Sequence, residues 1–290
     1  MAVQVRLTVH FSTNGSMGNS SQIKEWKTLE ALVAQARNQS RMLTNFFPDE
    51  QRMSGWCTNG KLTCGAFGKT TCLVHDQGTF SNLYFLTEKA ECLQEDVGEF
   101  LKTCGDARIV VDVLGPDRVR IPLEEALKSN GFSLQTVLQR MGRKTPAEVV
   151  DADMAVVCAT DADVGSVKAL LDEYFNAEQE QLPTADELKR WVERGELKIV
   201  RHDDAGVDGF VIYDLSPAQL YLRYWFVHPE ARGNGIGGKL MRTMFAAAAQ
   251  TKRQYFWVKT DNENAIIRYQ HYGFGMEPMK DSVWARGGKE

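Results

Sequence analysis

Four glycines lie within six positions of this chain, at Gly233, Gly235, Gly237 and Gly238, inside the stretch VHPEARGNGIGGKL (residues 227–240). An apolar run precedes the cluster and a helical apolar pattern follows it. Each glycine in a helix costs roughly 1 kcal/mol of stability relative to alanine. Free main-chain N–H groups at a helix N-terminus can hold an anion, and glycine lets a ligand approach them closely. The cluster therefore predicts an anion-binding loop, with a plain flexible turn as the alternative.

Residues 232–237 (RGNGIG) resemble the Arg/Gln-x-x-Gly-x-Gly/Ala signature of the GNAT acyltransferases, the Gcn5-related N-acetyltransferase superfamily. The resemblance runs from about residue 150 to the C-terminus. It includes Val-x-Pro at residues 227–229 and Asn-x4-Tyr-x3-Gly-Phe at residues 264–274. A dinucleotide site is disfavoured because no acidic residue ends a second parallel strand about 20 residues on. A P-loop is disfavoured because no Ser or Thr follows the Gly-Lys pair.

The resemblance implies that acetyl-CoA is the co-substrate. Main-chain N–H groups of the loop would bind its pyrophosphate, and the strand before the loop would pair with its pantetheine amides, much as an added strand would. The next strand, expected at residues 254–260, would splay away to open a slot for the thioester. The predicted cofactor-binding residues are Trp225, Phe226, Val227, Arg232, Gly233, Asn234, Gly235, Ile236, Gly237, Gly238 and Asn264.

Tyr269 occupies the position of the tyrosine that the family commonly uses, four residues before Gly273. The resemblance implies that its phenol protonates the departing thiolate, which is general acid catalysis. The alternative is a tyrosine on the helix whose ring serves only in packing. Asn264 matches a residue that contacts the cofactor in many relatives, and its alternative role is that of a helix N-cap.

The general base is where the sequence departs from the commoner pattern. Several relatives carry a glutamate on the strand before the glycine loop, whereas LYLRYWFV (residues 220–227) holds no carboxylate. Arg223, with Tyr221 or Tyr224, could line the acceptor cleft instead. Glu178 and Glu180 are candidates for deprotonation through water, with a solvated charge run as the alternative, and His228 is expected to be a turn residue.

Apolar periodicity in the second half predicts a strand, two helices, three strands, then helix, strand, helix and strand. A Thr184–Glu187 capping box starts the second helix, and a hairpin turn is expected at residues 203–206. The strands are expected at Met154–Thr160, Leu197–Arg201, Gly209–Asp214, Leu220–Val227, Gln254–Thr260 and Phe274–Ala285. The helices are expected from Asp163, from Pro183, from Ile236 and at Asn264–His271.

The first half is harder to interpret, with a glycine- and threonine-rich middle at residues 54–79 and a linker expected at residues 142–152. Its last helix is expected to start with Pro122, where proline is favoured. Strands are expected at Val3–Phe11, Asn82–Leu86 and Arg108–Leu114, and helices at about residues 22–37, at Ala90–Cys104 and at Pro122–Ser129.

The two halves repeat one order, in which an aromatic strand precedes a helix, a strand, a helix and a Gly-Phe pair. Leu83 lies 49 residues before Phe132, and Leu220 lies 54 before Phe274, which indicates internal duplication. The first half lacks the glycines, and Leu127 stands where the tyrosine would be. We therefore expect an α/β (α+β) fold with a mixed sheet in two GNAT-like domains in tandem: residues 1–144, degenerate and non-catalytic, and residues 150–290, catalytic.

Composition excludes several other classes. Hydrophobic residues make up 43% and charged residues 25%, as in a soluble globular protein. The net charge of −4 argues against a nucleic-acid or membrane-surface binder. No apolar run is long enough to span a bilayer, and the first residues do not resemble a signal peptide, so we expect a cytoplasmic protein. The six cysteines form no metal-site pattern, so we expect free thiols and no metal.

These features together predict an acetyltransferase that moves the acetyl group of acetyl-CoA to a primary amine of a small molecule or peptide. A catalytically silent acyl-CoA sensor or interaction protein is the alternative. Longer acyl donors or a hydroxyl acceptor also remain open. Arg223 is a hint of a carboxylate-bearing acceptor, whereas an acidic cleft would indicate a polyamine or an aminoglycoside. The sequence leaves the acceptor and the oligomeric state undetermined.

Overall fold

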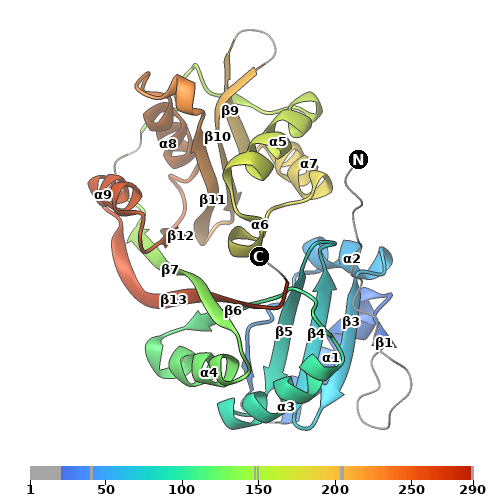
Figure 1. The fold of residues 1–290 in the computed structure, drawn as a ribbon. Coiled ribbons are helices and arrows are strands. Elements are labelled where there is room, and N and C mark those ends of the chain that lie inside the picture. The colour runs from blue at the N-terminus through green and yellow to red at the C-terminus, as the bar shows by residue number, and fades with distance from the viewer. Residues whose placement is uncertain (1–20, 40–41, 147, 149, 203–205, 289–290) are drawn as a thin grey trace. The chain divides into compact units, whose positions relative to one another are not determined.

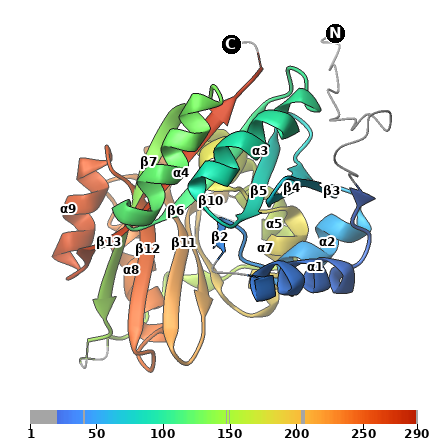
Figure 2. The same cartoon turned by 90° about the horizontal axis from the view of Figure 1, so that it is seen from below.

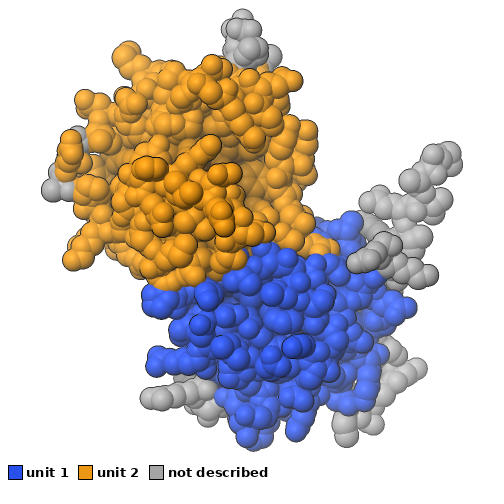
Figure 3. Space-filling view, turned by 60° about the vertical axis from the view of Figure 1, so that its left-hand side comes forward, with its two compact units in different colours: residues 1–137, 278–290 blue, residues 138–277 orange. Residues whose placement is uncertain are grey.

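The computed structural model describes residues 21–39, 42–146, 148, 150–202 and 206–288. The expected strand at Val3–Phe11 and most of the expected turn at residues 203–206 lie outside these ranges. The chain forms two compact units, which Figure 3 shows in different colours. The first unit contains residues 1–137 and 278–290, and the second contains residues 138–277.

The first unit is a mixed sheet with helices on both faces (Figures 1 and 2). Its strand order is β1-β3-β4-β5-β6-β13, and β2 pairs with β5. Only β5 and β6 are parallel among these pairs. The strands are β1 (Ser21–Gln22), β2 (Leu43–Thr44), β3 (Leu62–Phe67), β4 (Thr70–Asp76), β5 (Ser81–Thr87), β6 (Ile109–Gly115) and the second part of β13 (Gly275–Arg286). The helices are α1 (Trp26–Gln39), α2 (Glu50–Thr58), α3 (Ala90–Lys102) and α4 (Asp117–Ser129).

The second unit has the same plan, with the strand order β8-β9-β10-β11-β12-β7. Here β11 and β12 form the parallel pair, and the other pairs are antiparallel. The strands are the second part of β7 (Ser133–Lys144), β8 (Val157–Cys158), β9 (Leu197–His202), β10 (Gly206–Leu215), β11 (Gln219–Val227) and β12 (Arg253–Lys259). The helices are α5 (Val164–Tyr174), α6 (Ala177–Glu180), α7 (Ala185–Glu193), α8 (Ile236–Ala247) and α9 (Glu263–His271).

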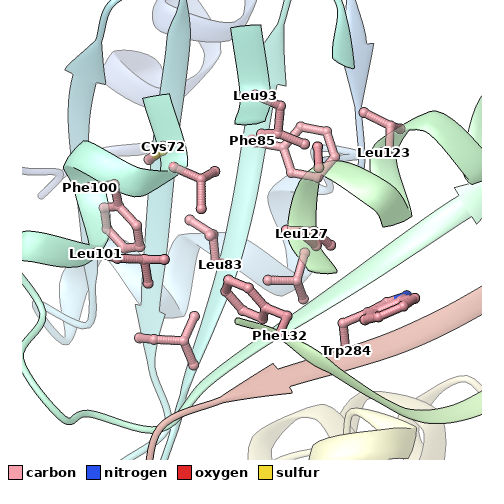
Figure 4. Packing of buried hydrophobic residues seen from close by; sticks show 14 of the residues in the cluster. Cys72, Leu83, Phe85, Leu93, Phe100, Leu101, Leu123, Leu127, Phe132 and Trp284 are labelled. Carbon is pink, nitrogen blue, oxygen red and sulfur yellow. The ribbon is translucent and has the colours of Figure 1, made fainter. Parts of the chain in front are cut away.

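Each sheet carries an apolar core on both faces. In the first unit, α3 and α4 cover one face, where Phe100, Leu127 and Trp284 belong to one buried apolar cluster (Figure 4). Helices α1 and α2 cover the other face. In the second unit, α8 and α9 cover one face and α5 and α7 cover the other. Strands buried on both faces read as continuous apolar runs, which is why the alternation is weak in strands such as β5.

The units repeat one another, as the sequence predicted. Both contain a parallel strand pair joined by a helix, β5-α3-β6 and β11-α8-β12, followed by a second helix that ends in a Gly-Phe pair. Gly131 and Gly273 follow these helices with φ of +80° and +81°, in the left-handed region that favours glycine. The shared glycines therefore terminate the equivalent helices in the same way.

The last strand of each half pairs within the unit formed mainly by the other half. Residues 138–144 of β7 pair antiparallel with β12, and residues 280–286 of β13 pair antiparallel with β6. The compact units therefore differ from the expected domains 1–144 and 150–290, because these strands satisfy the main-chain hydrogen bonds of an otherwise open edge.

Three further expectations need correction. The expected linker at residues 142–152 begins inside β7. Pro122 lies inside α4 and not at its start. Only Val157–Cys158 of the strand expected at residues 154–160 is formed. The capping box of Thr184 and Glu187 is confirmed at the start of α7.

Candidate active site

The parallel strands β11 and β12 separate after three residues. Pairing between them runs from Gln219 to Tyr221 and, within the described residues, goes no further. A β-bulge explains the divergence: Ile212 of β10 pairs with Tyr224 and Tyr213 with Leu222, which leaves Arg223 as an extra residue. A bulge bends and twists its strand. The rest of β11 therefore presents an edge that β12 does not pair with. This unpaired stretch between β11 and β12, the slot, lies where the strands were expected to splay apart.

The bulge also changes which side chains face α8 and α9. Before it, Leu222 packs into the core on that face. After it, Tyr224 and Phe226 point to the opposite face, toward α5 and α7, while Trp225 and Val227 pack on the α8 side. The sequence predicted a role for the main chain of residues 225–227, and the bulge adds a side chain, Trp225, beside the slot.

The glycine loop forms the start of α8. Gly233 and Gly235 have φ of +89° and +73°, and Gly235 is the N-cap of the helix. The N–H of Lys239 bonds to the carbonyl of Gly235 at 3.1 Å, so the N–H groups of residues 236–238 have no partner within the helix. No acidic side chain occupies the first turn. This arrangement suits an anion.

Gly237 and Gly238, the other two glycines of the loop, differ in what surrounds them. A Cβ at Gly237 would lie 2.9 Å from Cζ2 of Trp225, closer than real Cβ atoms approach, so Gly237 allows β11 and α8 to come together. A Cβ at Gly238 would meet nothing nearer than the Tyr272 hydroxyl at 4.0 Å. Gly233 and Gly235 are thus required for backbone conformation and Gly237 for packing, whereas Gly238 has no steric role.

Tyr269 lies on α9 with its ring in the core beside the slot. Its ring centroid is 3.9 Å from that of Phe256 and 5.5 Å from that of Trp225. Burial raises its pKa well above the usual value of 10, so the phenol keeps its proton at neutral pH. Asn264 is exposed on the same helix, and it is not the N-cap, because the Asn262 side chain accepts from Ala265 N at 3.2 Å.

On the opposite side of the slot, the Arg223 guanidinium already has a carboxylate partner. Its Nε donates to Asp214 at 2.6 Å, and its guanidinium lies 4.1 Å from the centroid of the Tyr221 ring. Tyr221 stacks in turn on Tyr255, with centroids 4.8 Å apart. Selection of a carboxylate-bearing acceptor by Arg223 stays a prediction, and Asp214 already neutralises part of its charge. His228 contacts aromatic rings, including that of Phe226.

Helix α6 connects the two separated strands. The Tyr224 hydroxyl on β11 donates to the main-chain carbonyl of Glu180 at 2.9 Å and to that of Gln181 at 3.2 Å. On β12, Lys259 forms an ion pair of 2.6 Å with the Glu180 carboxylate, whose side chain is only 19% exposed. Glu180 therefore reaches the slot and is not a freely solvated charge. Glu178 lies on the same helix, where its main-chain N–H donates to the Asn176 side chain at 2.9 Å.

In the first unit, the equivalent slot is filled by the chain itself. Strands β5 and β6 pair only at Ser81–Asn82 in the described structure, and the segment after α1 enters the gap. The Asn45 amide donates to the carbonyls of Leu83 on β5 and Asp112 on β6, at 3.1 and 2.9 Å, and accepts from Phe85 N at 2.8 Å. These groups are consequently unavailable to a ligand.

The segments that differ occupy the same place in the two halves. β2 and Asn45 lie between α1 and α2, and α6 lies between α5 and α7. The segment with β2 and Asn45 fills the slot of the first unit. Helix α6 instead contacts both strands that border the slot of the second unit. Leu127, which replaces the tyrosine, is fully buried, and α3 carries Glu91 in its first turn, where an anion would be repelled.

Other candidate features show no site. The six cysteines are free, and five of them are buried. Within the described ranges, no group of three or more His, Cys, Asp or Glu side chains is placed to hold a metal ion. In the same part of the chain, no helix is both long and apolar enough to cross a membrane.

Comparison with known proteins identifies a family over part of the second unit. Residues 193–275 match the model of the acetyltransferase (GNAT) domain family. A curated acetyltransferase of Agrobacterium fabrum is 31% identical over 75 residues, which are 26% of this chain and 55% of that protein. The chain thus matches little more than half the length of this relative.

Solved structures extend the likeness in fold to most of the chain. A GCN5-related N-acetyltransferase from Sphaerobacter thermophilus aligns with a TM-score of 0.56 at 11% identity, over 79% of this chain and 82% of that one. A GNAT-family acetyltransferase from Colwellia psychrerythraea gives 0.54 at 16% identity, over 93% and 100%. A tandem GNAT protein from the clavulanic acid biosynthesis pathway gives 0.52 at 12% identity, over 79% and 83%.

Proposed function

Residues 193–275 form a GNAT acetyltransferase domain, and from this premise we propose that the protein transfers the acetyl group of acetyl-CoA to a primary amine of a small molecule or peptide. The observation that carries the proposal is the loss of pairing between β11 and β12 beyond Tyr221, with the N-terminus of α8 following the end of β11. The composition and the free thiols support a cytoplasmic setting.

The residues around the slot fit coenzyme A in three ways. The N–H groups at the start of α8 provide donors for the pyrophosphate, with Arg232 exposed nearby. The uncovered edge of residues 225–227 provides main-chain groups for the pantetheine amides. A buried indole N–H on Trp225 also lacks a partner. Asn264, exposed near the start of α9, is an additional proposed contact.

Acetyl-CoA supplies an activated thioester, and the protein supplies position and proton control. Tyr269 keeps its proton because burial raises its pKa, so it can donate from Oη to the sulfur that leaves. Glu180 is the carboxylate that reaches the slot from the α5 and α7 face, and we assign to it the acceptance of the amine proton, directly or through water. The acceptor amine therefore enters from the side of α6.

The first unit is proposed to be non-catalytic. Asn45 occupies the main-chain groups that a pantetheine arm would need, and Leu127 cannot donate a proton. Such a unit can shape or support the acceptor site without binding acyl-CoA itself.

The test is a release assay for free CoA thiol with a panel of primary amines, together with calorimetry of CoA binding. The proposal expects CoA to bind and at least one amine to give turnover that requires Tyr269. Tight CoA binding with no turnover on any amine or hydroxyl acceptor would favour the silent sensor. Absence of CoA binding would overturn the proposal.

A further inference from the structure

The side chain of Trp225 has a buried donor without a partner. Among the described residues, the buried side-chain polar atoms that make no hydrogen bond are Arg120 Nε, Trp225 Nε1 and Asp281 Oδ1. Of these residues, only Trp225 belongs to the second unit. A buried donor left unpaired destabilises a protein, so its presence in a native structure calls for an explanation.

The surroundings of this indole place it along the slot. Its ring packs on the first turn of α8, where a Cβ at Gly237 would lie 2.9 Å from Cζ2 and 3.5 Å from Cε2, the carbon that bears Nε1. On another side, its ring centroid is 5.5 Å from that of Tyr269. Trp225 therefore stands between the proposed anion loop and the proposed general acid, on the part of β11 that β12 leaves uncovered.

This position defines which part of a ligand can meet the donor. In coenzyme A, the portion between the pyrophosphate and the sulfur is the pantetheine arm, and its strongest hydrogen-bond acceptors are two amide carbonyls. We propose that Trp225 Nε1–H donates to an amide carbonyl of the pantetheine arm of bound acyl-CoA. This inference rests on the proposed function and adds a side-chain contact to the expected main-chain contacts.

The contact makes Trp225 a specificity determinant for the arm and not for the nucleotide. Adenosine 3′,5′-bisphosphate lacks the arm, so its binding should not depend on the indole N–H. Gly237 supports the contact indirectly, since any side chain there would displace the ring.

The experiment replaces Trp225 with 3-benzothienylalanine, in which sulfur replaces the N–H and the ring keeps its shape. Calorimetry then measures affinity for CoA and for adenosine 3′,5′-bisphosphate, with circular dichroism to verify folding. We expect CoA to bind about three- to tenfold more weakly, as for one lost hydrogen bond, and the bisphosphate to bind unchanged. The same replacement at Trp257 of β12, which lies under the Arg140 guanidinium, is the matched control and should change neither affinity.

Trp225→Phe provides a second variant, with the same pattern expected across the two ligands. If the unmodified protein binds CoA and the analogue at position 225 binds it equally well, this inference is overturned and the proposed function stands. Equal weakening of both ligands would also overturn it, since the effect would then belong to the loop. If the unmodified protein does not bind CoA, the proposed function itself fails.

Discussion

Alanine at Gly237 and alanine at Gly238 should change stability by different amounts, although the two residues are neighbours in the first turn of α8. A Cβ at Gly237 would lie 2.9 Å from the Trp225 ring, whereas ordinary contacts begin at 3.4 Å. The ring or the helix must therefore move by about half an ångström or more, and overpacking of this kind costs about 1–3 kcal/mol. A Cβ at Gly238 has its nearest neighbour at 4.0 Å.

The magnitude follows from comparing the two variants. Both replace a glycine whose φ is compatible with alanine, which stabilises the protein by about 0.4–1 kcal/mol through the unfolded chain. Because this contribution is shared, the difference in unfolding free energy between the variants is the overpacking cost alone, about 1–3 kcal/mol. Gly238→Ala should be more stable than the unmodified protein, and Gly237→Ala should be no more stable, or less so.

Urea denaturation followed by circular dichroism measures the difference, and calorimetry with CoA measures its consequence. Gly237→Ala should weaken CoA binding about tenfold or more, as expected if displacement of the first turn removes one hydrogen bond to a charged group. Gly238→Ala should keep CoA affinity close to that of the unmodified protein. If the two variants unfold at the same urea concentration and bind CoA equally, the assignment of Gly237 to the Trp225 contact is wrong.

Further outcomes follow from the same structure. Tyr269→Phe should lower kcat by about 10²–10⁴ without changing CoA affinity, and unchanged turnover with chemistry rate-limiting would return the residue to a packing role. Calorimetry should find one CoA per chain, because Asn45 fills the slot of the first unit. Two CoA molecules per chain would disprove the prediction that the first unit binds none. Burial alone would raise the pKa of Glu277, but hydrogen bonds from Arg253 and Arg140 outweigh it and lower the pKa below 4.5. Glu277→Gln should therefore destabilise the protein by roughly 1–3 kcal/mol at pH 7, and the difference should shrink as pH falls below 4.5; a difference independent of pH would contradict this account.

The sequence predicted those features that depend on neighbouring residues. The capping box at Thr184 and the glycine loop at residues 233–238 are local signals with a known backbone meaning, and both lie where expected. The repeated order of elements was also visible, because each strand and helix has its own periodicity. Tyr269 lies on α9 with its ring against Phe256, and its role as the general acid stays a prediction.

Features that depend on distant partners could not be predicted. Asn45 is one polar residue in an irregular segment, and its role requires strands that lie 38 and 67 residues away. The bulge at Arg223 depends on the register with β10, and without it the Trp225 side chain cannot be assigned to a face. Pro122 suited a helix start, but the helix begins earlier and tolerates one missing main-chain hydrogen bond.

The placement of the last strand has a consequence for how the protein is made. Ribosomes build a chain from its N-terminus, and earlier domains commonly fold before later ones are synthesised. Here β6 lacks its second neighbour until residues 280–286 arrive, so the sheet of the first unit stays incomplete until the whole of the second unit has been synthesised. The second unit meets no such delay, because residues 138–144 precede the rest of its sheet. A message truncated just before codon 278 would therefore yield a protein whose earlier-made half carries the defect, with an exposed strand edge that favours aggregation.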